Sequence, residues 1–128
     1  MSNDAEAVVT AFFKAMGPPY ENCRKAWEDF MTDDAVWLNS GFPDCNGKEA
    51  CLAFLDGFAQ QTGMVSLGVE MLAISSNGDT VLTERVDSFL NADGAVIADL
   101  PLMGVLKVRD GRIVHWHDYF DPRPLLGG

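Results

Sequence analysis

The sequence is poor in positive charge. Its 128 residues include nine lysines and arginines against 19 aspartates and glutamates, so the formal net charge is −10. Such a chain repels a phosphate backbone or an anionic lipid surface, and we therefore expect no nucleic-acid partner and no membrane partner. Strongly acidic substrates are disfavoured for the same reason. A neutral, apolar small molecule is compatible with this charge.

Long apolar runs are also missing. No run approaches the roughly 18 uncharged residues of a membrane-spanning helix, and the first residues carry acid where a signal peptide carries base. The three cysteines, Cys23, Cys45 and Cys51, show no C-x-x-C spacing, which favours reduced structural thiols. We therefore expect a cytoplasmic protein, and its length predicts one domain over residues 1–128.

Apolar residues make up 48% of the chain, enough for a core. Helical periodicity predicts helices at 3–16, 20–31 and 47–61, with a short strand at 34–39. Alternation and turn signals predict strands at 64–76, 80–90, 95–108 and 113–121. Helices followed by hairpin-linked strands predict an α+β fold, in which a curved antiparallel sheet wraps around the N-terminal helices and forms a conical pocket.

The strand predicted at 80–90 carries charge in its middle. Because successive residues of a strand face opposite sides, Arg85 and Asp87 share a face with Val81, Thr83 and Phe89. Two interpretations are open. The face is exposed and the charges form a surface ion pair, or it lines a pocket in which the charges have a chemical role.

Two other predicted strands combine polar and large apolar side chains on one face. In the last strand, Asp118 shares a face with Val114 and Trp116, and in the first strand Asn39 shares a face with Trp37. Large apolar groups with one or two polar ones are typical of a small-molecule pocket. The alternatives are that the tryptophans belong only to the core and that Asn39 belongs to a turn.

His115 and His117 form an H-x-H pair, and the chain has no third histidine. By alternation they face away from Asp118, so we expect them on the outer face of the sheet or in a subunit interface rather than in a metal site. Asp118 also has a structural alternative, since it could cap a turn or pair with Arg123.

Three segments are similar to one protein family. "SSNG" followed by "TERVD", "LMGVLKV" followed by "GRI", and "WHDYFD" resemble the limonene-1,2-epoxide hydrolase family. That family has the nuclear-transport-factor-two-like, or SnoaL-like, α+β cone fold. The resemblance runs from about Ser75 to Asp121 and continues more weakly through "VWLN" and the N-terminal helices. Many unrelated activities use this fold, so the functional inference depends on the matching residues.

Carried over by position, the resemblance implies that Asp87 is the acid, Asp118 is the base and Arg85 is the arginine between them. It also implies that Asn39 helps to hold the attacking water. The family's tyrosine, in a Y-x-N pattern, is Trp37 here, so the chain departs from the family at this position. The implied substrate contacts are Phe89, Leu100, Leu102, Trp116, Phe120 and Leu125.

The sequence therefore predicts an epoxide hydrolase without cofactor or metal, which adds water to an epoxide on an apolar small molecule and gives a vicinal diol. A second interpretation is a SnoaL-like polyketide cyclase or a ketosteroid-isomerase-like enzyme, in which an aspartate moves a proton beside a carbonyl. A third is a ligand-binding dimer module without catalysis. Leu82, Val86 and Tyr119 on the other sheet face predict a homodimer.

Overall fold

The computed structural model describes residues 4–126. Its helices are α1 (Asp4–Lys14), α2 (Tyr20–Phe30), α3 (Lys48–Thr62) and the short α4 (Arg123–Leu126). Its strands are β1 (Met31–Asn39), β2 (Cys45–Asn46), β3 (Met64–Asn77), β4 (Thr80–Asn91), β5 (Val96–Arg109) and β6 (Arg112–Tyr119). The order of the strands in the sheet is β2-β1-β6-β5-β4-β3.

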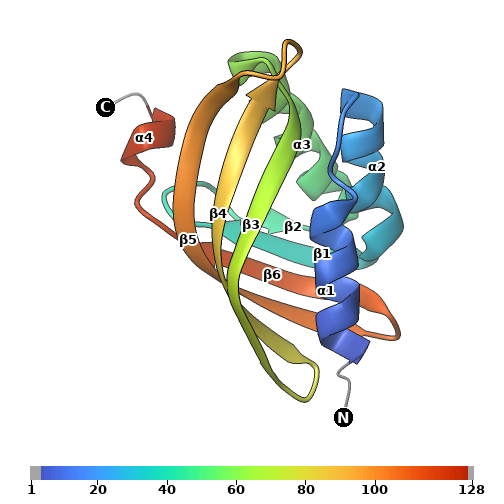
Figure 1. The fold of residues 1–128 in the computed structure, drawn as a ribbon. Coiled ribbons are helices and arrows are strands. Elements are labelled where there is room, and N and C mark those ends of the chain that lie inside the picture. The colour runs from blue at the N-terminus through green and yellow to red at the C-terminus, as the bar shows by residue number, and fades with distance from the viewer. Residues whose placement is uncertain (1–3, 127–128) are drawn as a thin grey trace.

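The sheet is strongly curved, and α1, α2 and α3 lie on its concave side (Figure 1). This arrangement confirms the predicted α+β cone. The short β2 and α4 were not predicted, and β1 begins three residues earlier than the predicted strand. No helix among residues 4–126 is long and apolar enough to cross a membrane.

The sheet is mixed, whereas the sequence predicted an antiparallel one. β1 runs parallel to β6, and every other pairing is antiparallel. Tight turns join β3 to β6 in sequence order, and such turns produce antiparallel neighbours. β1 is separated from β6 by α3 and four strands, so its direction depends on a long connection. Local turn signals carry no information about such a contact.

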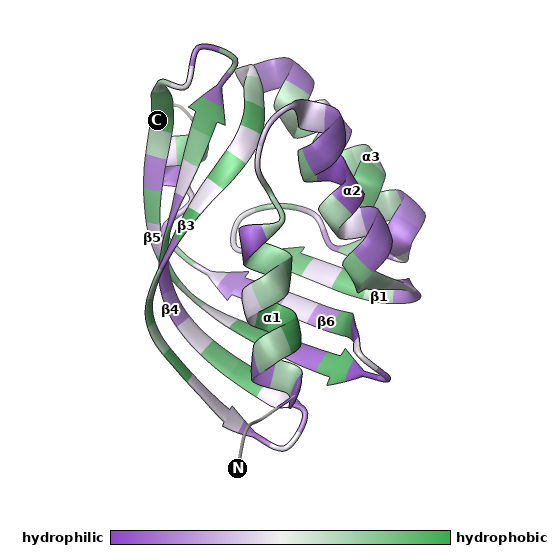
Figure 2. Cartoon of the chain, turned by 45° about the vertical axis from the view of Figure 1, so that its right-hand side comes forward, coloured by the Kyte–Doolittle hydropathy of each residue, from purple (hydrophilic) through white to green (hydrophobic). Residues whose placement is uncertain are grey.

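The core lies between the N-terminal helices and the concave face. Val9 and Phe12 of α1 and Cys23 and Trp27 of α2 are fully buried, because their spacing of three or four residues forms one apolar stripe on each helix. Phe12 lies edge-on to Trp116 of β6, with 5.2 Å between the ring centroids. The rest of α2 is mostly hydrophilic, and the strands show alternating hydropathy (Figure 2).

The predicted alternation fails at the start of β6. Ile113 is fully buried and Val114 is half-buried, although counting back from Trp116 predicts the reverse. The register between β5 and β6 shifts between Ile113 and His115. A β-bulge of this kind inserts one residue and reverses the faces on one side of it. Val114 therefore does not share the inner face with Trp116 and Asp118.

Candidate active site

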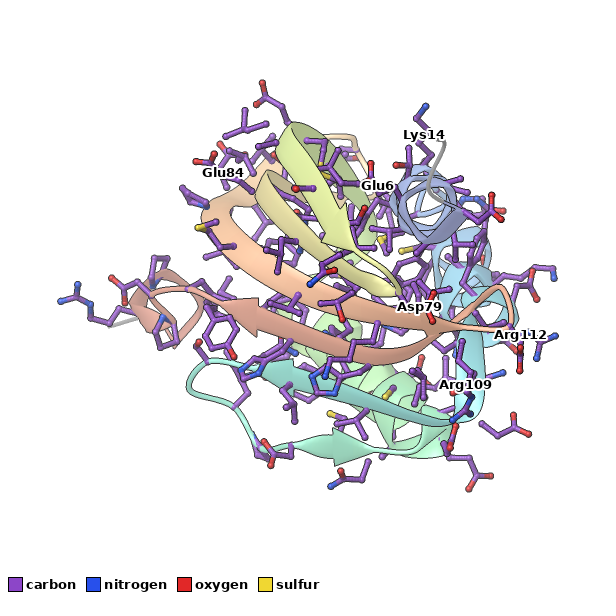
Figure 3. The ribbon with its side chains drawn as sticks, turned by 90° about the horizontal axis from the view of Figure 1, so that it is seen from below. Glu6, Lys14, Asp79, Glu84, Arg109 and Arg112 are labelled. Carbon is purple, nitrogen blue, oxygen red and sulfur yellow. The ribbon has the colours of Figure 1, made fainter. Side chains whose placement is uncertain are left out.

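Strand β4 carries three polar side chains on its inner face. Thr83, Arg85 and Asp87 are 2%, 0% and 5% exposed. A surface ion pair would leave both partners in solvent, so that interpretation is excluded and the predicted inward orientation is confirmed. Glu84 lies on the side of the sheet away from α1 (Figure 3).

The guanidinium of Arg85 lies between two carboxyl groups. Its Nε and Nη2 donate hydrogen bonds to Oδ1 and Oδ2 of Asp87 at 3.0 and 2.9 Å. The same Nη2 donates to Oδ2 of Asp118 at 2.8 Å. Since both Oδ2 atoms accept from one nitrogen, they are at most about 6 Å apart. The planar donor fork of Arg85 thus fixes both carboxyl groups in position.

Asp118, on β6, accepts a hydrogen bond at each carboxylate oxygen. Nε1 of Trp116 donates to Oδ1 at 2.7 Å, and Arg85 donates to Oδ2. The alternative pairing with Arg123 is not formed, because Arg123 binds Asp121 at 2.7 Å in an exposed ion pair. Each oxygen of Asp118 keeps a lone pair for a further donor, and the side chain lines a cavity.

The parallel pairing of β1 with β6 places Asn39 beside Asp118. These two residues are paired in register, as are Trp37 and Trp116. The backbone N–H of Ser40 donates to the carbonyl oxygen of Asp118 at 3.3 Å, which extends the contact beyond the end of β1. The amide of Asn39 and the carboxylate of Asp118 both line the same cavity, so one bound molecule can contact both.

Two tryptophan N–H groups near the site have no partner. Trp37 stacks on Trp116 with 4.9 Å between centroids and 16° between ring planes. Nε1 of Trp37 and Nε1 of Trp27 are the buried side-chain nitrogen or oxygen atoms without a hydrogen bond among residues 4–126. Trp37 is 7% exposed and Trp27 is 0% exposed. Buried donors without a partner are rare in native proteins, and each one calls for a physical explanation.

Burial dominates the electrostatics of the site. It raises the pKa of Asp118 from 3.8 to about 6; the charge and hydrogen bond of Arg85 oppose this rise, and the nearby charge of Asp87 adds to it. Burial also disfavours the charged form of Arg85, but the two carboxylates outweigh this effect and hold the pKa of Arg85 above its ordinary value. Arg85 therefore stays charged, whereas Asp118 titrates close to neutral pH.

Thr83 and Phe13 support Arg85, and neither was among the predicted site residues. Oγ1 of Thr83 accepts a hydrogen bond from Nη1 of Arg85 at 2.9 Å and donates one to the carbonyl oxygen of Gly104 at 3.0 Å. The ring of Phe13, from α1, lies 4.2 Å from Cζ of Arg85, in cation–π contact. The alternation of β4 was the available signal for Thr83. No local pattern connects Phe13 with Arg85.

Gly104 of β5 provides the space that the buried charges occupy. A Cβ atom at this position would lie 2.2 Å from Oδ1 of Asp118, 2.6 Å from Nη1 of Arg85 and 3.2 Å from Oγ1 of Thr83. Any side chain here would displace the charged groups. A glycine inside a strand is a weak sequence signal of such a close approach, and sequence reasoning did not use it.

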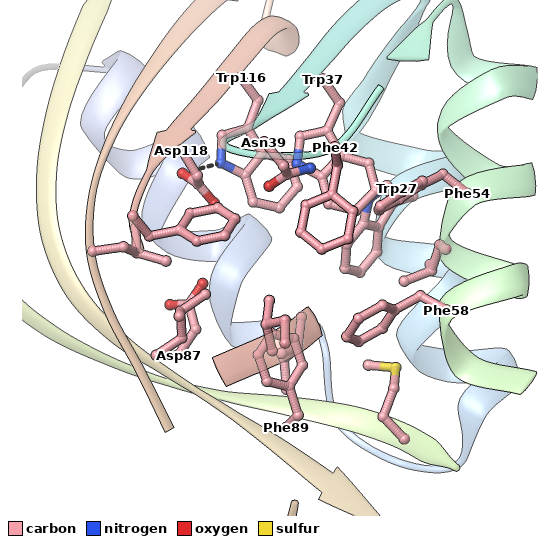
Figure 4. A pocket seen from close by; sticks show the side chains of 17 residues that line it. Trp27, Trp37, Asn39, Phe42, Phe54, Phe58, Asp87, Phe89, Trp116 and Asp118 are labelled. Carbon is pink, nitrogen blue, oxygen red and sulfur yellow. Dashed lines mark hydrogen bonds between the residues drawn. The ribbon is translucent and has the colours of Figure 1, made fainter. Parts of the chain in front are cut away.

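The polar groups form one side of a mostly apolar cavity. It contains about 530 Å³ of empty space, including the part that opens to solvent. Figure 4 shows Asp87 and Asp118 on one side and Phe54 and Phe58 on the other. The predicted contacts all line it: Phe89, Leu100, Leu102, Trp116, Phe120 and Leu125. Unpredicted lining residues include Trp27, Phe54 and Phe58 of the helices.

The two histidines lie outside this site. His117 stacks on Tyr119 at 3.9 Å, on the outer face as predicted. Strict alternation would put Ile113 on that face too, but it is buried because of the bulge in β6. Within residues 4–126 there is no group of three or more histidine, cysteine, aspartate or glutamate side chains that could hold a metal ion.

The sequence was compared with family models and with known proteins. The model of the limonene-1,2-epoxide hydrolase catalytic domain matches residues 3–128. The chain belongs to this family. Epoxide hydrolase EphG of Mycobacterium tuberculosis is 35% identical over 107 residues, which cover 79% of this chain and 68% of that protein. The predicted family is therefore confirmed.

Solved structures agree with the limonene-1,2-epoxide hydrolase assignment. An LEH-like epoxide hydrolase from M. tuberculosis has a TM-score of 0.74 and 29% identity, over 97% of this chain and 87% of that one. An NTF2-like protein of unknown function from Burkholderia pseudomallei has a TM-score of 0.76 over 99% of this chain and 97% of that one. It is 16% identical, so this likeness shows the fold alone. Where the resemblance implies a Y-x-N pattern, this chain has Trp37, Leu38 and Asn39.

Proposed function

We propose that this protein hydrolyses an epoxide on a largely apolar small molecule to a vicinal diol, by direct attack of water and without a cofactor. One observation carries the proposal. Two buried carboxyl groups share Arg85 at the wall of an apolar cavity, and Asn39 lies in register beside Asp118. Family membership and the 35% identity to an epoxide hydrolase support the reaction class.

The paired carboxyl groups supply the acid and the base that the reaction requires. Two carboxylates about 5–6 Å apart repel each other by roughly 3 kcal/mol at an effective dielectric constant near 20, which corresponds to about two pKa units. One of the pair therefore holds a proton near neutral pH, as in other paired-carboxyl sites. The charge of Arg85 keeps the other one ionised.

The position of Asn39 supports one division of the two roles. Asn39 is paired with Asp118 and not with Asp87, so a water held by the amide oxygen of Asn39 donates its other proton to Asp118. Asp118 is then the base, and Asp87, across the cavity wall, is the acid that protonates the epoxide oxygen. Arg85 donates two hydrogen bonds to Asp87 and one to Asp118. A proton that rests on Asp118 in the empty cavity must therefore pass to Asp87 before attack.

The step balances without a further reactant. The water oxygen forms a bond to one ring carbon while the bond from that carbon to the ring oxygen breaks, and the electron pair stays on the ring oxygen. This oxygen takes the proton of Asp87, and Asp118 takes a proton from the water. One proton then returns from Asp118 to Asp87, and one water molecule has been consumed. Relief of ring strain supplies much of the driving force.

Trp37 replaces the family's tyrosine in positioning the water. The water gives its two protons to Asp118 and Asn39, and one of its lone pairs faces the carbon. The other lone pair accepts from a donor, and the unpartnered Nε1–H of Trp37 is such a donor on the same strand face as Asn39. Phe89, Leu100, Leu102, Trp116 and Phe120 contact the apolar part of the substrate.

Single turnover in heavy-oxygen water tests the mechanism, after a panel of epoxides has identified a substrate. Direct attack places the label in the diol during the first turnover and leaves the protein unlabelled. An ester intermediate would place the label in a protein carboxyl group, so its recovery in the peptide that contains Asp118 would overturn direct attack. Absence of diol from every epoxide would overturn the reaction class.

A second candidate function is proton transfer next to a carbonyl group. The observation that favours it is the buried carboxyl of Asp118, whose pKa of about 6 suits a base that removes a proton from carbon. Such an enzyme would exchange deuterium into a cyclic ketone and would form no diol. If neither reaction occurs and the two Asp→Asn variants bind ligands as the wild type does, the protein is a binding module.

We also infer a homodimer through the outer face of the sheet. Leu82, Met103 and Tyr119 are 49%, 58% and 52% exposed, and they lie on three neighbouring strands. Met103 is paired with both Glu84 and Tyr119, so these side chains form a continuous surface. Exposed apolar patches of this kind are typical of interaction surfaces, and a flat sheet face can pack on its own copy about a two-fold axis.

A further inference from the structure

Phenylalanine side chains form much of the accessible wall of the cavity. Five of the eight phenylalanines in the chain line it: Phe42, Phe54, Phe58, Phe89 and Phe120. All five are half-buried, so each keeps accessible surface. In contrast, the lining residues Leu55, Leu100 and Leu102 are 3%, 3% and 6% exposed. A molecule in the cavity therefore meets phenyl rings more than these aliphatic side chains.

Helix α3 and strand β4 place the phenyl rings relative to the acid. Phe54 and Phe58 are four residues apart on α3, a spacing that brings both rings to one face of the helix. Phe89 follows Asp87 by two residues on β4, so the two side chains share the inner face. Two residues of an extended strand span roughly 7 Å. A molecule whose oxygen contacts Asp87 can therefore place its adjoining atoms beside the ring of Phe89.

Successive rings contact one another along the wall, in the order Phe120, Phe42, Phe54, Phe58 and Phe89. Their centroids are 6.4, 5.7, 6.5 and 5.3 Å apart, within the range in which aromatic rings attract each other. The planes of successive rings differ by 40°, 78°, 19° and 54°. Because these angles vary, the wall presents a mixture of ring faces and ring edges. An aromatic ligand thus finds stacked or edge-to-face partners in more than one orientation.

We propose that the substrate is an aryl epoxide, whose aromatic ring contacts this series of phenylalanines while its epoxide group contacts the carboxyl groups. The inference rests on the proposed function, which places the epoxide oxygen at Asp87. Figure 4 shows Asp87 and Asp118 on the opposite side of the cavity from Phe54 and Phe58. An aryl epoxide has the same division into a polar end and an aromatic end.

The surroundings of the rings also restrict the substituents of the aryl group. Besides the phenylalanines, α3 and β3 contribute Leu55, Met64 and Leu67 to the lining, and all three are apolar. A charged or hydrogen-bonding substituent on the aromatic ring would lose its hydration there without gaining a partner, which is costly. The proposed substrate class is therefore an aryl epoxide whose ring is unsubstituted or carries apolar groups.

Recognition of an aromatic ring can be separated from simple hydrophobicity. A cyclohexyl group has more apolar surface than a phenyl group with the same six carbons. A cavity that selects only for apolar surface therefore binds the cyclohexyl compound more tightly. Each favourable ring–ring contact instead favours the phenyl compound by roughly two- to tenfold. The direction of the preference distinguishes the two kinds of cavity.

A binding experiment on the wild-type protein tests the inference without any turnover. The probes are 1-phenylethane-1,2-diol and 1-cyclohexylethane-1,2-diol, the diols that hydrolysis of the two matched epoxides would give. Their use keeps the greater intrinsic reactivity of a benzylic epoxide carbon out of the comparison. We expect NMR titrations to show that the phenyl diol binds at least about threefold more tightly. Its ring protons should give NOEs to the rings of Phe54, Phe58 or Phe89. Equal affinities, tighter binding of the cyclohexyl diol, or NOEs confined to residues outside the cavity would overturn the inference.

Variants of the wall give the second test. The double variant Phe54→Leu/Phe58→Leu removes two rings from the wall, so the cyclohexyl diol should become the tighter ligand. Phe30→Leu is the matched control, because Phe30 is half-buried, packs on Phe12 at 5.7 Å and is not among the described residues that line the cavity. It should keep the preference for the phenyl diol. Each ratio compares two ligands of one protein, so it does not depend on small changes in stability. An unchanged ratio in the double variant would contradict recognition by these rings.

The outcomes separate this inference from the proposed function. Preference for the phenyl diol, with no diol formed from any epoxide, would refute the hydrolase and leave the recognition of aryl groups intact. Diol formation together with a preference for the cyclohexyl diol would refute the recognition of aryl groups and leave the hydrolase intact.

Discussion

The two faces of β4, β5 and β6 each depart from the usual distribution of side chains. On the inner face, Arg85 and Asp118 are almost fully buried and carry charge or a titrating proton. On the outer face, Leu82 and Met103 are about half exposed. In an ordinary sheet the charged side chains would be outside and the apolar ones inside.

Stability alone explains neither departure. Buried ion pairs are often no more stabilising than apolar side chains of the same volume, because the charges lose their hydration. Apolar side chains that stay exposed to water do not stabilise the fold. The inner face is understood if its charges perform chemistry, and the outer face if a second copy of the chain covers it. Each explanation leads to its own experiments.

The largest effect is expected from the inner carboxyl groups. Asp87→Asn and Asp118→Asn remove the acid and the base, which an amide cannot replace, so each should lower kcat by about 10²- to 10⁴-fold. Diol formation and the thermal midpoint of unfolding are the measurements. Asp121→Asn is the matched control, because it removes a carboxylate from an exposed Arg–Asp pair and should leave kcat unchanged. Diol formation within tenfold of wild type in either inner variant, with the same thermal midpoint, would contradict the roles.

The second prediction concerns pH. Because the proposed reaction needs one proton on the carboxyl pair, and burial raises the pKa of Asp118, where this proton rests in the empty cavity, to about 6, kcat/KM should fall up to tenfold per pH unit above pH 6. The pH profile of kcat/KM on a neutral epoxide checks this. A profile that stays flat up to pH 8 would show that the proton lost near pH 6 is not the one that the reaction uses.

The free energy of unfolding should depend on the same titration of Asp118. The pKa of Asp118 is higher in the folded protein than the 3.8 of an unperturbed carboxyl. Its protonated form therefore stabilises the fold fully below pH 4, and this contribution is lost as the pH rises through 6. The free energy of unfolding of the wild type should consequently fall by about 3 kcal/mol relative to that of Asp118→Asn between pH 4 and pH 7.

Gly104→Ala should damage the inner face without removing a functional group. The added Cβ would overlap Asp118 and Arg85, so we expect a loss of about 1–3 kcal/mol of stability and at least tenfold in kcat. Gly57→Ala is the control, since a Cβ at that exposed helical position meets no atom within 4 Å and should stabilise α3 by up to about 1 kcal/mol. Full activity of Gly104→Ala would mean that the carboxyl groups do not need this geometry.

The outer face is tested by Met103→Glu. A charge in the middle of the proposed interface should raise the dimer dissociation constant by about tenfold or more, measured by analytical ultracentrifugation. Ala53→Glu places the same charge on the exposed side of α3 and should leave the dimer intact. A wild-type protein that is monomeric at high concentration would refute the interface and would leave the apolar outer face without an explanation.

The smallest effect is expected at Trp37. Trp37→Phe removes the N–H that is proposed to orient the water, and it should cost about 0.5–1.5 kcal/mol, or severalfold in kcat. Trp37→Tyr restores a donor and should remain active, and its smaller ring should admit bulkier epoxides. Equal rates in Trp37→Phe and the wild type would show that Trp37 only forms part of the cavity wall. Activity that appears only in Trp37→Tyr would mean that the natural chain does not perform this hydrolysis.

The sequence predicted what depends on neighbours along the chain. Strand alternation placed Arg85 and Asp87 on one face and left open whether that face is exposed. The family resemblance favoured a pocket and brought Asp118 and Asn39 to them. The elements that it missed depend on long-range contacts. The ring of Phe13 under Arg85 and the position of Trp27 follow from how the helices pack on the sheet. The bulge at Ile113 follows from pairing between strands. These contacts leave no periodic signal in the local sequence.

The pairing of β1 with β6 has a consequence for how the protein folds. β6 is the last strand in sequence, yet it lies between β1 and β5 in the sheet. Until β6 is inserted, β1 has no neighbour in the sheet that links it to β3, β4 and β5. Asn39 is then far from its partner, Asp118. Such non-local closure is entropically costly and slow. During synthesis on a ribosome, the site therefore forms only after nearly the whole chain has emerged, and any chain that ends before β6 exposes two unpaired strand edges that are prone to aggregation.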